Sequence, residues 1–157
     1  MHISKSKAVA FSGLVWFILG FYLLIKGIRL VLEGALLAKV NLPLISSLKP
    51  FFPEPIQGAL FIVCIGLLIG FIKGRFVLSK TVNRVMSRIH SFDDTVNMWK
   101  MYDSRYLILL LSMFLIGMLM KVIPVPQDIL ALIDISVGSA LINGFLIYFR
   151  HFLRLVF

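Results

Sequence analysis

Residues 8–25 read AVAFSGLVWFILGFYLLI and contain no charged side chain. An α-helix rises about 1.5 Å per residue, so this stretch crosses most of a hydrocarbon core of roughly 30 Å. The whole chain has the same character, because 60% of its 157 residues are hydrophobic and its mean hydropathy is +1.00. A water-soluble fold does not bury that share of apolar side chains. The sequence therefore predicts an integral membrane protein.

Three further apolar stretches predict three more membrane-spanning helices, and hence an all-α bundle that forms a single domain over residues 1–157. We expect the four helices at about 8–34, 56–89, 106–123 and 129–150, with an outer loop at 35–55 and a cytoplasmic loop at 90–105. Prolines, which resist helix continuation, mark the outer connections at 43–55 and 124–126. Beyond the membrane, the second helix is expected to continue as a basic amphipathic segment.

The distribution of Lys and Arg predicts the orientation in the membrane. In the four-helix arrangement, 11 of the 16 basic residues lie on the side of the two termini and five on the other side. Cytoplasmic loops are enriched in Lys and Arg, so we expect both termini in the cytoplasm and the protein in the inner or plasma membrane. Attraction to anionic lipid also accounts for the net charge of +9 without a nucleic-acid partner.

The bilayer itself is therefore the expected partner, with anionic headgroups as the specific contact. Lys80, Arg84 and Arg88 share one face of the predicted basic segment and are candidate headgroup contacts. A basic face exposed to water explains these three residues equally well.

Glycines recur at the spacing of a helix-packing face in the first two predicted helices. One stripe repeats every seven residues and the other is a doubled GxxxG pattern: Gly13, Gly20, Gly27 and Gly34, then Gly66, Gly70 and Gly74. Small residues let helix backbones approach closely in a membrane. We expect these stripes to pack against copies of the same chain or against a larger membrane partner.

Asp134 is the one acidic residue deep within an apolar stretch, and an intramembrane carboxylate is a candidate functional residue. Lys121 lies about one turn before Pro124, at a similar depth on the preceding helix. We prefer a structural clamp between Asp134 and Lys121 to a proton or ion site. On the first helix, Lys26 is expected to lie away from the glycines and to extend toward the outer interface, together with Arg29 and Glu33.

The last predicted helix carries polar residues on two faces. Ser139 and Asn143 project from one side and Asp134 from nearly the opposite side, so both faces are expected to take protein neighbours. Asn143 needs a hydrogen-bond partner in hydrocarbon, which a neighbouring helix packed on small residues supplies. Core packing is the preferred interpretation of this face, and a polar pathway is the alternative.

The sequence offers little support for catalysis. The single cysteine, Cys64, excludes an intrachain disulfide and a cysteine-based metal site. His90, Asp93 and Asp94 lie together in the cytoplasmic loop, yet no metal, nucleotide or hydrolase motif accompanies them. We therefore expect no metal and no cofactor.

Three functions remain as hypotheses. The first is a non-enzymatic module for helix packing, assembly or lipid interaction, working as a homo-oligomer or with a larger membrane partner. The second is a small homo-oligomeric transporter or channel with Asp134 and Asn143 along its pathway. The third, which has the least support, is a lipid-modifying enzyme that uses His90 with Asp93 or Asp94.

Overall fold

The computed structural model describes residues 2–37, 42–80, 87, 95–97 and 125–156. Within them three long helices form the bundle: α1 (Lys5–Leu37), α3 (Pro55–Lys73) and α7 (Gln127–Val156). Each contains a segment long and apolar enough to cross a membrane, namely Ala10–Leu37, Pro55–Phe76 and Gln127–Leu153. By length and composition, the three long helices are therefore compatible with a membrane protein. The expected helix at 106–123 lies outside the described residues.

Four short elements complete the described fold. A six-residue helix, α2 (Pro43–Leu48), lies in the expected outer loop, and a π-helical turn, η1 (Gly74–Leu78), follows α3. Two strands of three residues each, β1 (His2–Ser4) and β2 (Thr95–Asn97), pair antiparallel in the register His2↔Asn97. The predominantly helical structure confirms the all-α expectation, and this short ribbon joins the N-terminus to the segment before the third expected span.

Prolines set the beginnings of the helices. α2 starts with Pro43 and α3 with Pro55, and a proline in the first turn costs no hydrogen bond because the amide there has no partner within the helix. Pro126 lies just before α7, where its carbonyl accepts the amide of Leu130 at 3.0 Å. The helices α1 and α7 extend a few residues beyond the expected 8–34 and 129–150 at each end.

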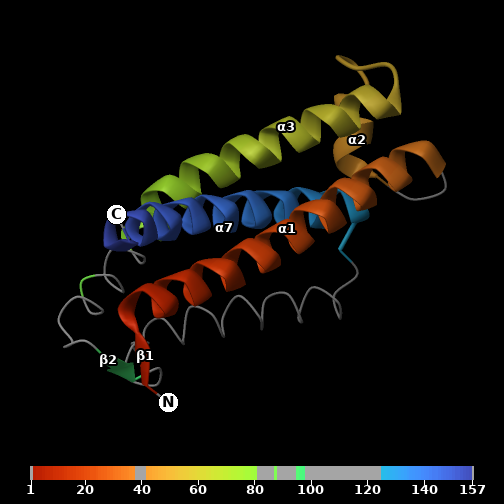
Figure 1. The fold of residues 1–157 in the computed structure, drawn as a ribbon. Helices are drawn as coiled ribbons and strands as arrows, with labels where there is room; N and C mark the ends of the chain where they lie inside the picture. Colours follow the sequence, from red (N-terminus) through yellow and green to blue (C-terminus); the bar gives the residue numbers. More distant parts are fainter. Residues whose placement is uncertain (1, 38–41, 81–86, 88–94, 98–124, 157) are drawn as a thin grey trace.

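α7 is the central helix, with α1 on one side and α3 on the other (Figure 1). α1 runs antiparallel to α7, because Gly13 lies beside Tyr148 near one end of the pair and Gly34 lies beside Gln127 near the other. The N-terminus and the C-terminus consequently lie at the same end of the bundle (Figure 1). We call this the terminal end, and the opposite end, which carries α2, the α2 end.

α3 runs parallel to α7. Gly66 of α3 lies against Ile135, and Gly74, two turns later at the start of η1, lies against Ala140 and Asn143. Two neighbouring helices that point the same way cannot be joined by a short turn.

Among the described residues, one cluster of buried hydrophobic side chains lies at the α2 end, where α1, α2, α3 and α7 meet. The buried side chains of this cluster come from each helix: Val31 and Ala35 of α1, Leu42 and Ile45 of the α2 region, Ala59 and Ile62 of α3, Ala131 and Ile135 of α7. Toward the terminal end, the described buried side chains lie mainly along α7 and on the side of α1 that faces it, such as Trp16, Leu141 and Tyr148.

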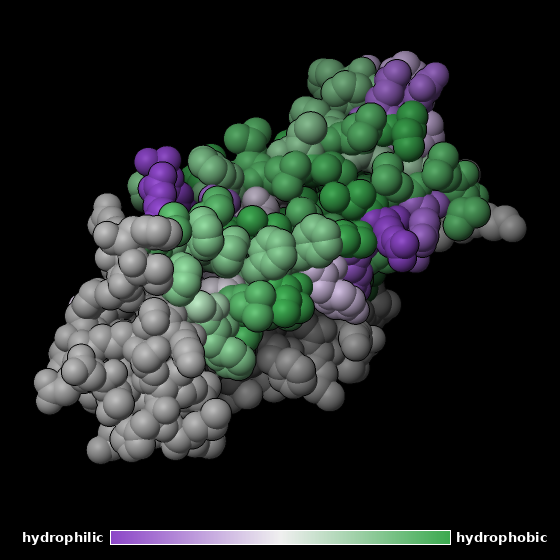
Figure 2. Space-filling model, in the orientation of Figure 1, coloured by the Kyte–Doolittle hydropathy of each residue, from purple (hydrophilic) through white to green (hydrophobic). Residues whose placement is uncertain are grey.

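The outer surface of the bundle is apolar. Large hydrophobic side chains are exposed along α1, α3 and η1, among them Phe11, Ile18, Leu68 and Phe76. Figure 2 shows this hydrophobic surface extending between polar groups near the two ends of the molecule. An exposed apolar surface of this extent suits contact with lipid and not with water.

Candidate functional site: an ion pair and a polar helix inside the bundle

The strongest polar feature inside the bundle is an ion pair between α1 and α7. Lys26 Nζ donates a hydrogen bond to Asp134 Oδ2 at 2.7 Å. The Asp134 side chain is 11% exposed and that of Lys26 is 38% exposed, so the pair lies at the edge of the α1–α7 seam. Charge neutralisation within the pair is what makes a carboxylate acceptable at this depth in an apolar bundle.

The glycine stripe of α1 brings the two charged residues within reach. A Cβ atom at Gly27 would lie only 2.9 Å from the carbonyl oxygen of Ala131 and 2.8 Å from the side chain of Ile135. The backbones of α1 and α7 are therefore in direct contact one residue after Lys26. From this position the lysine side chain reaches Asp134 across the seam.

This pair differs from the one that the sequence led us to prefer. Lys121 lies outside the described residues, and the structure shows Lys26 as a partner of Asp134. Lys26 therefore does not simply extend to the outer interface, because its ammonium group is bound inside the bundle. Arg29 and Glu33 of the same helix are exposed.

Ser139 and Asn143 lie on the opposite side of α7, facing α3. Ser139 Oγ donates to the carbonyl oxygen of Leu67 at 3.2 Å, which joins α7 to α3. Asn143 Nδ2 donates to the carbonyl oxygen of Ser139 at 3.0 Å, so the amide finds its partner within its own helix. The structure does not bring Asn143 and Asp134 together, since the body of α7 separates them.

The glycines of α3 make this second seam as tight as the first. A Cβ atom at Gly70 would collide with the carbonyl oxygen of Ser136 and would lie 2.6 Å from Cβ of Ser139. At Gly74 it would lie 2.9 Å from Cα of Ala140. Both glycine stripes thus lie against α7 of the same chain, in addition to any contact that they make elsewhere.

Asp128 is a structural residue that the sequence did not single out. Its side chain is fully buried. Its Oδ2 accepts hydrogen bonds from the backbone amides of Leu44 at 2.6 Å and Ile45 at 3.3 Å. Its Oδ1 accepts the amide of the next residue, Ile129, at 2.9 Å. One carboxylate therefore caps the start of α2 and the start of α7 together. The only sequence signal is an acidic residue just after the Pro124/Pro126 pair.

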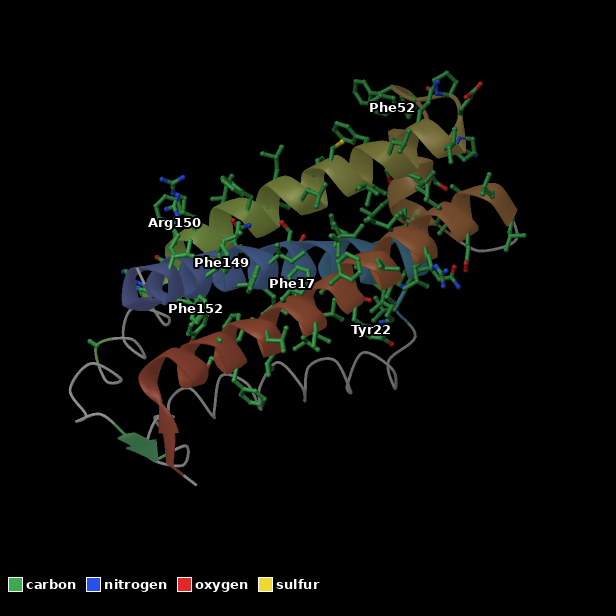
Figure 3. The ribbon with its side chains drawn as sticks, in the orientation of Figure 1. Phe17, Tyr22, Phe52, Phe149, Arg150 and Phe152 are labelled. Atoms are coloured by element: carbon green, nitrogen blue, oxygen red, sulfur yellow. The ribbon has the colours of Figure 1, made fainter. Side chains whose placement is uncertain are left out.

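A small pocket lies between α1 and α7 at the terminal end. It has a volume of about 190 Å³ and is lined by Ala10, Gly13, Leu14, Phe145, Tyr148, Phe149 and Phe152. Figure 3 shows Phe152 on the side of α7 that faces α1, whereas Arg150 points away from α1. The spacing 145, 148, 149 and 152 marks one helix face and was the available sequence signal for this aromatic cluster.

The remaining candidate residues fall largely outside the described part of the chain. Lys80 is exposed just beyond η1, whereas Arg84, Arg88, His90, Asp93 and Asp94 are not described. Among the described residues, no group of three or more His, Cys, Asp or Glu side chains is placed to hold a metal ion. Cys64 is an exposed free thiol on α3.

No protein-family model matches the chain, and neither the curated proteins nor the solved structures contain a significant match.

Proposed function

We propose that the protein is a non-enzymatic multi-pass membrane module, in which a bundle closed within one chain presents a basic end to anionic lipid. The observation that carries the proposal is that both glycine stripes pack against a helix of the same chain. Gly20 and Gly27 lie against α7, and so do Gly66 and Gly70, all within one chain. Tight packing faces that would otherwise recruit other helices are occupied internally, which leaves an apolar outer surface for lipid or a partner.

The directions of the helices support four membrane crossings. α3 and α7 are parallel neighbours, and each is long and apolar enough to span a bilayer. If both cross the membrane, the chain between them crosses it once more in the opposite direction. Four crossings then leave both termini on the same side, in keeping with their common end in Figure 1.

The charges support a cytoplasmic location for that end. The helix ends that meet there carry Lys5, Lys7, Lys73, Arg75, Arg150 and Arg154, and no acidic residue accompanies them in residues 2–25, 55–80 or 136–156. Glu33, Glu54 and Asp128 all belong to the α2 end. A basic end of this kind is typical of the cytoplasmic side and attracts anionic headgroups.

The transporter hypothesis receives less support from the geometry. A pathway along α7 needs Asp134 and Asn143 on one continuous surface, but they lie on opposite sides of that helix, against α1 and α3. The carboxylate of Asp134 is also bound by Lys26. Both polar groups therefore have structural partners, which favours packing over conduction.

Native mass spectrometry after gentle extraction from the membrane tests this proposal. We expect one copy of the chain that retains anionic phospholipid, alone or with a larger partner. The double variant Lys80→Glu with Arg150→Glu reverses two exposed charges at the terminal end and should reduce lipid retention, whereas Lys49→Glu at the α2 end should not. A homo-oligomer that retains no anionic lipid would contradict the proposal.

A further inference from the structure

The pocket between α1 and α7 is apolar and open at one side. The aromatic rings of Phe145 and Phe149 lie 5.8 Å apart, and Phe145 also packs on Phe17 at 4.9 Å, so the wall on the α7 side is a connected aromatic cluster. Gly13 lines the pocket where α1 and α7 approach closely, since a Cβ atom there would lie 3.1 Å from Cβ of Tyr148. At the mouth, Leu14 is 51% exposed and Phe149 is 45% exposed.

The solvent around this mouth is hydrocarbon if α1 and α7 cross the membrane. Leu14 lies four residues inside the membrane-spanning segment of α1, and Phe149 lies four residues before the end of that of α7. At about 190 Å³ the pocket is smaller than the roughly 300–1,000 Å³ typical of sites for drug-sized ligands. Its size and apolar lining suit a portion of a flexible hydrocarbon chain and not a whole polar ligand.

Charge complementarity indicates which lipid supplies the chain. The first turn of α1, which carries Lys5 and Lys7, lies next to the pocket along the helix, and Arg154 follows Phe152 by two residues on α7. A phospholipid whose tail enters between the helices therefore has its headgroup at the basic terminal end. There, each Lys or Arg favours an anionic headgroup over a zwitterionic one.

We infer that the pocket lined by Gly13, Leu14, Phe145 and Phe149 binds an acyl chain of an anionic phospholipid from the leaflet at the terminal end. The inference rests on the proposed function and adds a specific site to it. The headgroup lies at the basic helix ends and the tail occupies the apolar pocket between α1 and α7. The residues that form this site differ from Lys80, Arg84 and Arg88, which the sequence offers as headgroup contacts.

Electron paramagnetic resonance of tail-labelled lipid tests the inference. The full-length protein is reconstituted in phosphatidylcholine vesicles that contain a trace of spin-labelled phosphatidylglycerol or, in parallel, spin-labelled phosphatidylcholine. We expect the wild-type protein to immobilise more phosphatidylglycerol than phosphatidylcholine. Leu14→Trp fills the mouth of the pocket and should abolish that preference, so that both lipids give the same immobilised fraction.

Two further variants keep the test decisive. Ile18→Trp, at an exposed position one turn along α1 and outside the pocket, places the same ring on the lipid-facing surface and should preserve the preference. Ala10→Leu narrows the pocket from its other edge with a smaller change and should reduce the preference in the same direction as Leu14→Trp. An undiminished preference in both Leu14→Trp and Ala10→Leu would overturn the inference.

The outcomes also separate the site from the wider proposal. If the wild-type protein retains anionic lipid in the mass spectrum but neither pocket variant changes immobilisation, the acyl-chain site is wrong and the proposed function stands. If the wild-type protein retains no anionic lipid and does not distinguish the two labelled lipids, both are wrong. A transmembrane partner recovered with the wild-type protein but lost from Leu14→Trp would assign the pocket to a protein helix and overturn the inference.

Discussion

The two ends of the bundle are held together in different ways. At the α2 end four helices converge on one buried cluster, and polar contacts from Asp128 and Asp134 join separate segments of the chain. At the terminal end α1 and α7 meet through Gly13 and a set of aromatic rings, and a pocket remains between them. Within the described residues, the comparison is between an end joined by a buried cluster and an end where α1 and α7 leave an apolar pocket between them.

The difference follows from what each end has available to bury. Near α2, the short helix inserts Ile45 into the space between the long helices, and Asp128 satisfies the two backbone amides that this insertion would leave without a partner. No described element plays that role at the terminal end. Its aromatic side chains face either the seam or the surface, where lipid is the neighbour that a membrane provides.

The largest loss of stability is expected between the two ends, where α1 and α7 cross. A Cβ atom at Gly138 would lie 2.7 Å from the carbonyl oxygen of Gly20 and 2.7 Å from the amide nitrogen of Leu24, which are backbone atoms that cannot turn aside. We expect Gly138→Ala to cost about 3 kcal/mol in the free energy of unfolding, because the helices have to separate. Unfolding by a denaturing detergent, followed by circular dichroism, measures it.

The matched control for that substitution is Gly58→Ala. There the added Cβ atom would make an ordinary contact of 3.5 Å with the side chain of Ile45. Alanine also favours a helix over glycine by about 1 kcal/mol, so this variant should be neutral or slightly more stable. Equal losses of stability in the two variants would mean that the close approach of α1 and α7 at Gly138 does not determine the stability of the bundle.

Breaking the ion pair should have the next largest effect. Asp134→Asn leaves the Lys26 ammonium without its counter-charge, and we expect a loss of about 2 kcal/mol, less than for a fully buried pair because Lys26 is 38% exposed. The double variant Lys26→Met with Asp134→Leu should recover most of the loss. A double-mutant cycle in the same unfolding assay gives the coupling, and strict additivity would show that the pair contributes nothing.

A smaller and more local effect is expected from Asp128→Ala. Removing the shared cap should cost about 1–2 kcal/mol, as loss of a helix cap does. Hydrogen exchange should quicken at the amides of Leu44 and Ile45, which donate to this carboxylate, and stay unchanged near Tyr148 at the terminal end. Unaltered protection at Leu44 would contradict the capping role.

The smallest effect is expected from the hydrogen bond between α7 and α3. Ser139→Ala removes the donor to the Leu67 carbonyl and should cost about 0.6 kcal/mol, the average found for such bonds between membrane helices. Ser47→Ala serves as the comparison, because the exposed Ser47 hydroxyl donates within α2, to the carbonyl oxygen of Pro43. A loss above about 2 kcal/mol in Ser139→Ala would show that this seam depends more on polar contact than on close glycine packing.

The sequence predicts the packing faces of this bundle well but not what lies against them. A seven-residue glycine repeat specifies a face of α1, because helical periodicity is a property of the local chain. It does not say whether that face meets α7, another helix or another copy. Ser139 and Asp134 were likewise placed on opposite faces of one helix by spacing alone, and the structure packs α3 against the first and α1 against the second.

Contacts between distant segments account for what the sequence could not supply. The sequence favours Lys121 as the partner of Asp134 because it lies at a similar depth on the preceding helix, and Lys121 falls outside the described residues. Lys26 is 108 residues away from Asp134 and reaches it because Gly27 lets the backbones touch. In the sequence, Asp128 is an ordinary acidic residue in a first helical turn, and its capping role depends on the position of α2 beside it. α2 lies in a proline-rich stretch of the sequence. Its six residues are too few for a helical periodicity to be recognised.

The most direct test of the central claim, that α1 packs on α7 of the same chain, is a cross-link between Phe17→Cys and Phe145→Cys in a Cys64→Ser background. The two rings are in contact, with centroids 4.9 Å apart, so a short bifunctional thiol reagent can bridge the new cysteines. The double variant should give a cross-linked monomer, and co-expressed single variants should give no dimer. A Phe17→Cys/Phe145→Cys dimer from co-expressed single variants would contradict the account, because α1 would then pack on α7 of another copy.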